Sequence, residues 1–116
     1  MLTLPAAVRI YLATGPVDLR KSIDGLGAMV SARGHDLFGG HLFAFTSRRG
    51  DRVKILCWDR GGFVLYYKRL EHGRFRLPTV APGAEEMQID ATQLAMLLDG
   101  IDVQRVPAPK RWSPKK

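Results

Sequence analysis

Cysteine is almost absent from this sequence: its 116 residues include only Cys57. A single cysteine cannot form an intramolecular disulfide, and no companion stands near Cys57 at metal-ligand spacing. This excludes a disulfide-stabilised fold and favours a reducing, cytoplasmic environment. Because Cys57 lies within an apolar strand pattern, we expect a small buried hydrophobe rather than a reactive thiol.

Long apolar runs are missing as well. The most apolar N-terminal segment, LTLPAAVRIYLATG, is interrupted by Pro5 and Arg9. It also falls short of the ~18 to 20 residues that a membrane-spanning helix needs. We therefore expect neither a signal peptide nor a membrane anchor, and no membrane partner.

Signals for cofactors and catalysis are scarce. The histidines His35, His41 and His72 have no metal-ligand spacing to one another, so we expect them in loops or at the surface. The serines lack a nucleophile-elbow context, and no glycine run has the form of a phosphate-binding loop. We predict that the protein binds no cofactor and no metal.

The carboxylates do not form a catalytic motif either. Asp18, Asp24, Asp51 and Asp59 have no spacing that would bring them together as a two-metal site requires. We predict that the protein is not an enzyme. A metal-dependent nuclease using Asp18, Asp24 and Asp59 is kept as a third hypothesis.

Positive charge is in excess and unevenly distributed within a formal net charge of +7. Residues 48–76 carry nine basic and three acidic side chains, residues 77–104 carry five acidic and no basic ones, and residues 105–116 carry five basic ones. Clustered cations gain free energy by releasing counterions from a phosphate backbone, so this pattern predicts a polyanionic partner. The alternative is that the acidic block and the basic tail neutralise each other.

Hydrophobic periodicity predicts a strand at residues 8–12 and then a helix. Thr14-Gly15-Pro16 is the predicted helix start, with Asp18 and Asp24 in the positive N-terminal half and Gly34 as the C-cap. The apolar stripe consists of Leu19, Ile23, Leu26 and Val30. Because Gly25 and Gly27 weaken a helix by about 1 kcal/mol each, we expect them to mark a close approach of the helix to the sheet.

A second helix is predicted near the C-terminus. Asp90 and Gln93 stand at capping-box spacing before an apolar stripe, and Gly100 is the predicted C-cap. The stripe consists of Leu94, Leu97, Leu98 and Ile101. Residues 87–89 are a predicted short edge strand, and the proline-rich stretch before them is a predicted loop. We expect one domain over residues 1–104 and a basic, proline-rich, flexible tail over residues 105–116.

The middle of the chain, residues 41–70, has the pattern of three strands joined by tight turns at Arg49-Gly50 and Arg60-Gly61. Opposite residues share a face of the sheet. One predicted face is aliphatic and holds Leu42, Ala44, Thr46, Val53, Ile55, Cys57, Val64 and Tyr66. The other is aromatic and holds His41, Phe43, Phe45, Lys54, Leu56, Trp58, Phe63, Leu65 and Tyr67, bordered by Arg52 and Arg69.

Together these elements predict an α+β fold: a small single domain in which an antiparallel β-meander of about four to five strands packs with two main helices. We expect the glycine-bearing first helix on the aliphatic face, because small side chains allow close approach. The aromatic face has two alternatives. Either the second helix covers it, or part of it stays exposed as a platform for bases or a partner protein.

The basic side chains at and beside the turns are expected to point into solvent and track phosphates. The predicted nucleic-acid-binding residues are Arg48, Arg49, Arg52, Lys54, Arg60, Lys68, Arg69, Arg74 and Arg76 for phosphates, Trp58 and Tyr67 for stacking on bases, and Lys110 and Arg111 in the tail.

Three segments resemble a known family. They are LATGPVDLRKSIDGLGAMV, GGHLFAFTSRRGDRVKILCWDRGGFVLYYKRLEHGRFRLP and QLAMLLDGID. In this order, from about Leu4 to Trp112, the chain is similar to the accessory protein TnpB (Orf2-like) of the bacterial insertion-sequence sixty-six family. The run from Gly40 to Pro78 is the most specific part.

The resemblance implies a mobile-element protein encoded beside a separate transposase, which carries the catalytic residues, and needed for efficient transposition. Our leading hypothesis is a non-catalytic, nucleoid-associated factor that binds DNA, at element ends or non-specifically, and assists the transposase. The second is an adaptor that docks on the transposase through the aromatic face or the acidic second helix without touching DNA. Homo-oligomerisation is left open.

Overall fold

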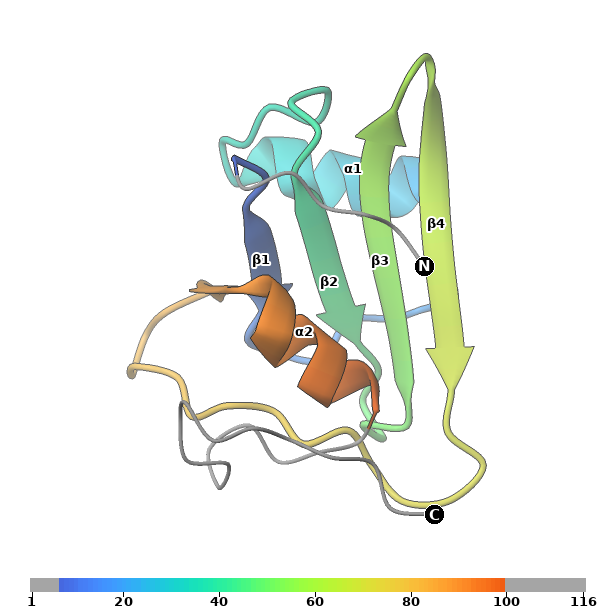
Figure 1. The fold of residues 1–116 in the computed structure, drawn as a ribbon, viewed down its shortest axis with the longest axis vertical. Helices are drawn as coiled ribbons and strands as arrows, with labels where there is room; N and C mark the ends of the chain where they lie inside the picture. The colour runs from blue at the N-terminus through green and yellow to red at the C-terminus, as the bar shows by residue number, and fades with distance from the viewer. Residues whose placement is uncertain (1–6, 100–116) are drawn as a thin grey trace.

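Five strands and two helices follow one another along residues 7–99, the part of the chain that the computed structural model describes (Figure 1). They are β1 (Ile10–Ala13), α1 (Ile23–Ala32), β2 (Leu42–Thr46), β3 (Arg52–Asp59), β4 (Gly62–Arg69), β5 (Glu86–Ile89) and α2 (Ala91–Leu98). This confirms the predicted α+β class. No helix within residues 7–99 is long and apolar enough to cross a membrane.

The sheet has the strand order β4-β3-β2-β1-β5 and is mostly antiparallel, as predicted. One pairing differs from a simple meander, because β1 and β2 run parallel, with Ile10 opposite Leu42. A parallel pair needs a long crossover, and α1 supplies it between these two strands. β5 confirms the predicted short edge strand and pairs antiparallel with β1.

The predicted hairpin register is confirmed. Phe43 lies opposite Leu56 in the first hairpin, and Asp59 lies opposite Gly62 in the second. Arg60 and Gly61 connect β3 to β4 with φ angles of 45° and 88°. Two successive positive φ angles fit the twist of a two-residue hairpin, so the turn chemistry fixes this register locally.

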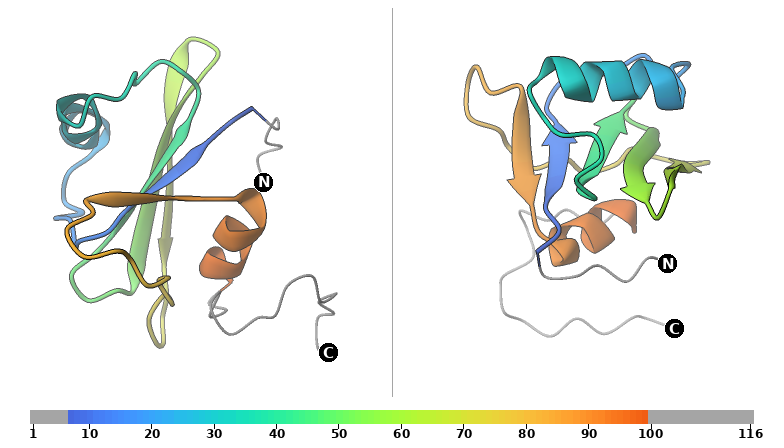
Figure 2. Two further views of the ribbon diagram at one scale, coloured as in Figure 1. Left: turned by 90° about the vertical axis from the view of Figure 1, so that its left-hand side faces the viewer. Right: turned by 90° about the horizontal axis from the view of Figure 1, so that it is seen from above.

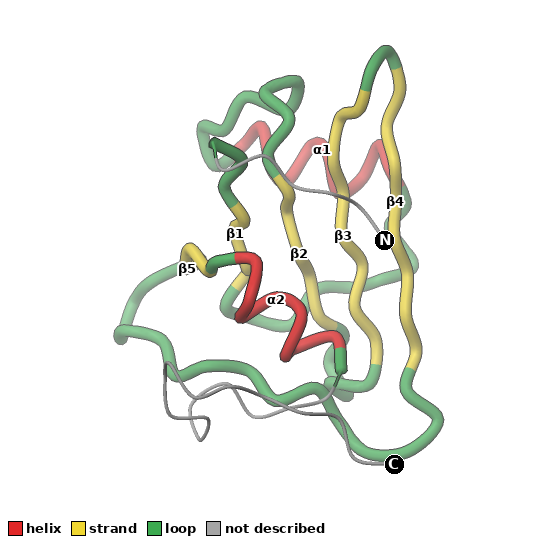
Figure 3. Tube along the Cα trace, in the orientation of Figure 1, coloured by secondary structure: helices red, strands yellow, loops and turns green. Residues whose placement is uncertain are grey.

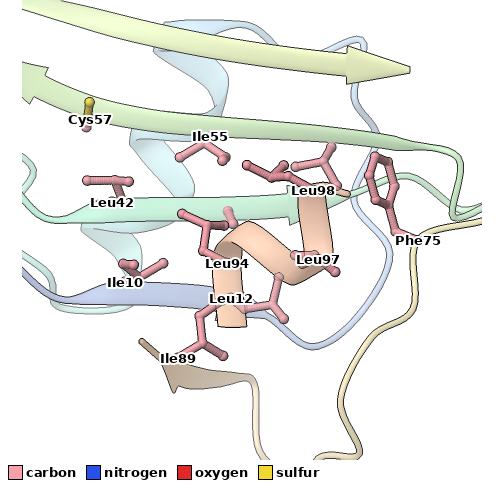
Figure 4. Packing of buried hydrophobic residues seen from close by; sticks show 12 residues of the cluster. Ile10, Leu12, Leu42, Ile55, Cys57, Phe75, Ile89, Leu94, Leu97 and Leu98 are labelled. Atoms are coloured by element: carbon pink, nitrogen blue, oxygen red, sulfur yellow. The ribbon is translucent and has the colours of Figure 1, made fainter. Parts of the chain in front are cut away.

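The helices lie on opposite sides of the sheet (Figure 2). α2 covers the aliphatic face, where Leu94, Leu97 and Leu98 pack on side chains from four strands (Figure 4). α1 covers the aromatic face, where Leu26 and Val30 pack with Phe43, Phe45 and Leu56. The aromatic face is therefore covered, but by α1 and not by the second helix that the sequence alternative named, and Tyr67 at its border stays 48% exposed.

The predicted assignment of helices to faces was wrong, since it placed α1 on the aliphatic side. That assignment assumed that Gly25 and Gly27 bring α1 close to the sheet. Instead, a Cβ at Gly27 would lie 3.0 Å from the Leu37 side chain, and one at Gly25 would meet Lys21. Gly27 thus makes room for the loop that follows α1, so α1 does not need a smooth strand surface.

α1 also begins later than predicted. Its N-cap is Ser22, and the expected start at Thr14-Gly15-Pro16 is part of the connection from β1. The reason is tertiary: Val17 is buried, and its N–H donates to the carbonyl of Thr46 at the end of β2 at 2.9 Å. Asp24 does lie in the first helical turn.

The predicted C-terminal stop of α1 at Gly34 is confirmed. Gly34 has a φ of 87°, its N–H donates to the carbonyl of Ser31 at 3.0 Å, and the N–H of His35 donates to the carbonyl of Val30 at 3.3 Å. This is a Schellman motif.

α2 forms as predicted at its start. The N–H of Gln93 donates to the Asp90 carboxylate at 2.7 Å, and the N–H of Asp90 donates to the Gln93 side chain at 2.9 Å. The predicted C-cap at Gly100 and the tail over residues 105–116, with Lys110 and Arg111, lie outside the described residues. These expectations stay predictions.

The two helix starts allow a matched test. Asp90→Ala removes the capping bond of α2 and should lower the free energy of unfolding by about 1 kcal/mol. Ser22→Ala removes a cap residue whose side chain makes no capping hydrogen bond, so its effect should be much smaller. Urea unfolding followed by circular dichroism measures both, and equal losses for the two variants would contradict this account of the caps.

Candidate nucleic-acid interface

Arg48 and Arg49 stand at the tip of a turn that is held by its own hydrogen bonds. The Gly50 N–H donates to the Ser47 carbonyl at 3.0 Å, and the Arg52 N–H donates to the Ser47 hydroxyl oxygen at 3.2 Å. Gly50 has a φ of 77°, which favours glycine. The turn therefore presents two exposed arginines from a fixed backbone.

The segment after β4 is tied to the same turn. The Leu70 N–H donates to the carbonyl of Asp51, and the Phe75 N–H donates to the carbonyl of Gly50, both at 2.7 Å. Phe75 is buried in the α2-side core and anchors this segment. As a result, Arg74 lies against Gly50.

The connection from β1 to α1 approaches the turn from the other side. Because β1 and β2 are parallel, their carboxyl ends lie at the same edge of the sheet, and the segments that follow them are neighbours. The hydrogen bond from Val17 to Thr46 fixes this neighbourhood. In α/β sheets, the carboxyl ends of parallel strands are a common place for ligand sites.

An open cleft of about 520 Å³ lies between these two segments. We call it the arginine cleft, and in Figure 3 the turn between β2 and β3 marks its end of the sheet. One wall is Pro16, Val17, Asp18, Leu19 and Arg20, and the other is Ser47, Arg48, Arg49, Asp51 and Arg52.

The structure brings together five of the predicted phosphate contacts at this end of the sheet: Arg48, Arg49, Arg52, Arg69 and Arg74. Arg52 and Arg69 are directly opposite each other on neighbouring strands. Like charges in this position destabilise a sheet. Within residues 7–99, the buried Arg52 Nε also has no hydrogen-bond partner.

Of the other four predicted phosphate contacts in residues 7–99, only Arg60 is distant from this end. Arg60 lies in the turn at the far end of the eight-residue strand β3, roughly 25 Å away at ~3.3 Å per residue. Lys54 and Lys68 donate to main-chain carbonyls, of Lys21 at 2.9 Å and of Leu98 at 2.5 Å. Arg76 is exposed one residue beyond Phe75.

The two predicted stacking residues lie apart. Tyr67 is on the α1 side of the sheet near the arginines, with the Lys54 ammonium 5.5 Å from its ring centroid. Trp58 lies toward the opposite end of β3, where its ring is 5.0 Å from those of Phe38 and Phe63. Only Tyr67 is therefore placed to act together with the arginine cleft.

Two of the three histidines have structural partners. His35 pairs with Glu86 at 2.7 Å and packs on Tyr11, and His41 accepts the Arg9 N–H at 2.9 Å. Cys57 is buried, as predicted, and burial raises the pKa of its thiol. Among the described residues, no group of three His, Cys, Asp or Glu side chains could hold a metal ion.

Sequence reasoning missed Arg20, which it assigned to the first helix. Arg20 forms a two-pronged salt bridge with Asp18, in which its Nη2 lies 2.8 Å from Oδ2 and its Nε lies 3.0 Å from Oδ1. The main-chain N–H of Arg20 also donates to Oδ1 at 3.0 Å. These bonds from Arg20 lower the pKa of Asp18 to about 2. Only the parallel pairing of β1 and β2, a long-range feature, could have indicated Arg20.

Comparison with known proteins identifies the family. A family model described as IS66 Orf2 like protein matches residues 8–108. The chain belongs to this family of insertion-sequence proteins that are accessory to transposition. The resemblance seen in the sequence is thereby confirmed.

Two relatives come from Sinorhizobium fredii (strain NBRC 101917 / NGR234). The uncharacterized protein y4jC is 40% identical over 100 residues, which cover 85% of this chain and 84% of y4jC. The uncharacterized protein y4hO is 37% identical over 117 residues, which cover 100% of this chain and 98% of y4hO. No solved structure matches the chain.

The Asp18–Arg20 pair predicts a specific titration. Arg20→Ala should return the pKa of Asp18 from about 2 toward its ordinary value of about 3.9. Lys21→Ala should have a smaller effect on this pKa, because the Lys21 side chain acts on the Asp18 carboxylate only through its charge, without a hydrogen bond. NMR titration of the side-chain carboxyl carbon measures both variants. An Asp18 pKa that Arg20→Ala leaves in place would contradict the observed hydrogen bonds.

Proposed function

We propose that this family member is a non-catalytic accessory protein that binds nucleic acid through the arginine-rich end of its sheet and thereby assists the transposase in DNA transposition. The observation that carries the proposal is the convergence of Arg48, Arg49, Arg52, Arg69 and Arg74 from two turns and two strands. A cluster of positive charge held in place by the protein main chain attracts the negatively charged phosphates of a nucleic acid.

Two features suggest that this convergence serves a partner. Arg52 and Arg69 face each other across the ladder, an arrangement that costs stability. Arg69 Nε lies 3.1 Å from Glu71, but this pair is exposed and offsets little of the cost. Within residues 7–99, Arg48, Arg49 and Arg52 form no salt bridge. A polyanion bound at this end of the sheet would relieve the repulsion between the arginines. In the protein alone, the same repulsion contributes nothing favourable to the free energy of folding.

We propose a non-catalytic role because both carboxylates of the arginine cleft already have hydrogen-bond partners within the protein. Asp18 is held by Arg20, and Asp51 accepts the Ser47 hydroxyl at 3.2 Å. Both therefore act in shaping the cleft walls. A nuclease would instead need carboxylates converging on a metal.

One observation favours the adaptor as the second candidate. The side chains of Val64 and Tyr66 in the outer strand β4 are 37% and 36% exposed, on the side of the sheet that α2 covers. This strip could contact the transposase. Its binding should persist in high salt, where a phosphate-driven contact fades.

Charge reversal tests the proposed function. Arg48→Glu with Arg49→Glu should weaken binding to element ends and to unrelated duplexes alike. The slope of log K against log salt should become shallower by roughly 0.9 for each phosphate that the variant no longer neutralises. Fluorescence anisotropy over a salt series measures both quantities.

Arg60→Glu is the matched control, because Arg60 also sits in an exposed hairpin turn but at the other end of β3. Its effect on affinity and slope should be clearly smaller. Wild-type affinity in the Arg48/Arg49 variant, or equal losses at both turns, would count against an interface confined to the arginine-rich end.

A further inference from the structure

We infer that the arginine cleft is a binding site for a single phosphodiester group. In the absence of that group Asp18 pairs with Arg20, and when the group binds it replaces Asp18 as the partner of Arg20. The inference rests on the proposed function and makes it more specific. Arg20 becomes an additional phosphate contact from the wall opposite Arg48 and Arg49. Asp18 becomes an anion of the protein itself that competes with the phosphate for Arg20.

The cleft has the composition of an anion site. Four arginines outnumber the two aspartates, Asp18 and Asp51, in its lining. The arginines come from two segments that lie more than twenty-five residues apart in the chain: Arg20, Arg48, Arg49 and Arg52. The backbones of both segments are fixed by hydrogen bonds, through Val17 on one side and Ser47 on the other. An anion between the walls would thus meet cations that are already gathered.

The Asp18–Arg20 pair has a hydrogen-bond geometry that a phosphate group can also adopt with Arg20. The Asp18 carboxylate accepts hydrogen bonds from both Nε and Nη2 of Arg20. Guanidinium groups use the same two-pronged geometry to bind phosphate oxygens. The Arg20 side chain is 91% exposed and that of Asp18 is 47% exposed. Exposed pairs contribute little stability, so a phosphate can take the place of the carboxylate at low cost.

The cleft is open rather than enclosed, so a phosphate within a longer chain can enter it laterally. Arg69, opposite the wall residue Arg52 on the neighbouring strand, adds a further cation beside the cleft, although its Nε lies 3.1 Å from Glu71. Of the predicted phosphate contacts within residues 7–99, only Arg60 follows the aromatic group of Phe38, Trp58 and Phe63 at the far end of the sheet, so these contacts form no comparable cluster there.

The test uses the full chain, labelled with nitrogen-15, and two probes at constant ionic strength: the dinucleoside monophosphate TpT and inorganic phosphate. TpT should shift the amide signals of residues 17–20 and 48–51. A response to inorganic phosphate alone would overturn the assignment of a phosphodiester site and indicate a free-phosphate site. No shift in these residues with either probe would overturn the inference.

Two variants separate competition from support. Arg20→Gln should raise the dissociation constant for TpT about threefold or more, and Asp18→Asn should lower it about two- to fivefold by removing the competing anion. Weaker binding by Asp18→Asn would show that Asp18 only positions Arg20, which overturns the exchange. Arg33→Gln, in the C-cap of α1 and outside the cleft, should leave the constant unchanged.

Duplex DNA distinguishes this inference from the proposed function. If DNA binds the wild type but neither Arg20→Gln nor Asp18→Asn changes its affinity, the cleft inference is overturned while the function stands. If TpT shifts the cleft amides but DNA does not bind, the cleft inference stands and the proposed function fails.

Discussion

The parallel pairing of β1 with β2 is the constraint on which the rest of the arrangement depends. It requires a crossover, which α1 provides, and it places the carboxyl ends of both strands at one edge of the sheet. The hydrogen bond between Val17 and Thr46 then holds the two following segments side by side. Without this pairing, Arg20 and Arg48 would belong to unrelated parts of the surface.

The two helices cover opposite faces of the sheet, and within residues 7–99 Arg48, Arg49 and Arg74 at the arginine-rich end remain exposed. α1 packs on the aromatic face and α2 on the aliphatic one, so each apolar side of the sheet has its own cover (Figure 2). Burial of these side chains supplies most of the stability. The edge with the arginines can therefore hold like charges in proximity, as Arg52 and Arg69 do.

Features decided by neighbouring residues could be predicted from the sequence. The pairings of β2, β3 and β4 follow from turn chemistry, such as the positive φ angles at Arg60 and Gly61. The capping box of α2 and the stop of α1 at Gly34 have the same local origin. The turn arginines of the candidate site were found for this reason.

Features decided by distant contacts could not be predicted. The late start of α1 depends on the hydrogen bond from Val17 to the end of β2, and Gly27 makes room for Leu37 of the following loop rather than for the sheet. Arg20 was missed because its neighbours across the cleft are distant in the chain. Conversely, Trp58 and Arg60 look close to the arginines in the sequence, but the eight residues of β3 hold them apart.

Hydrogen–deuterium exchange of the full chain, with and without a duplex that carries an element end, tests whether the arginine-rich end of the sheet contacts DNA. We expect slower exchange on DNA binding at residues 14–21, 47–52 and 69–76, and little change at residues 58–63. Protection centred on the turn at Arg60 and the aromatic residues around Trp58, with none at the arginine-rich end, would contradict it.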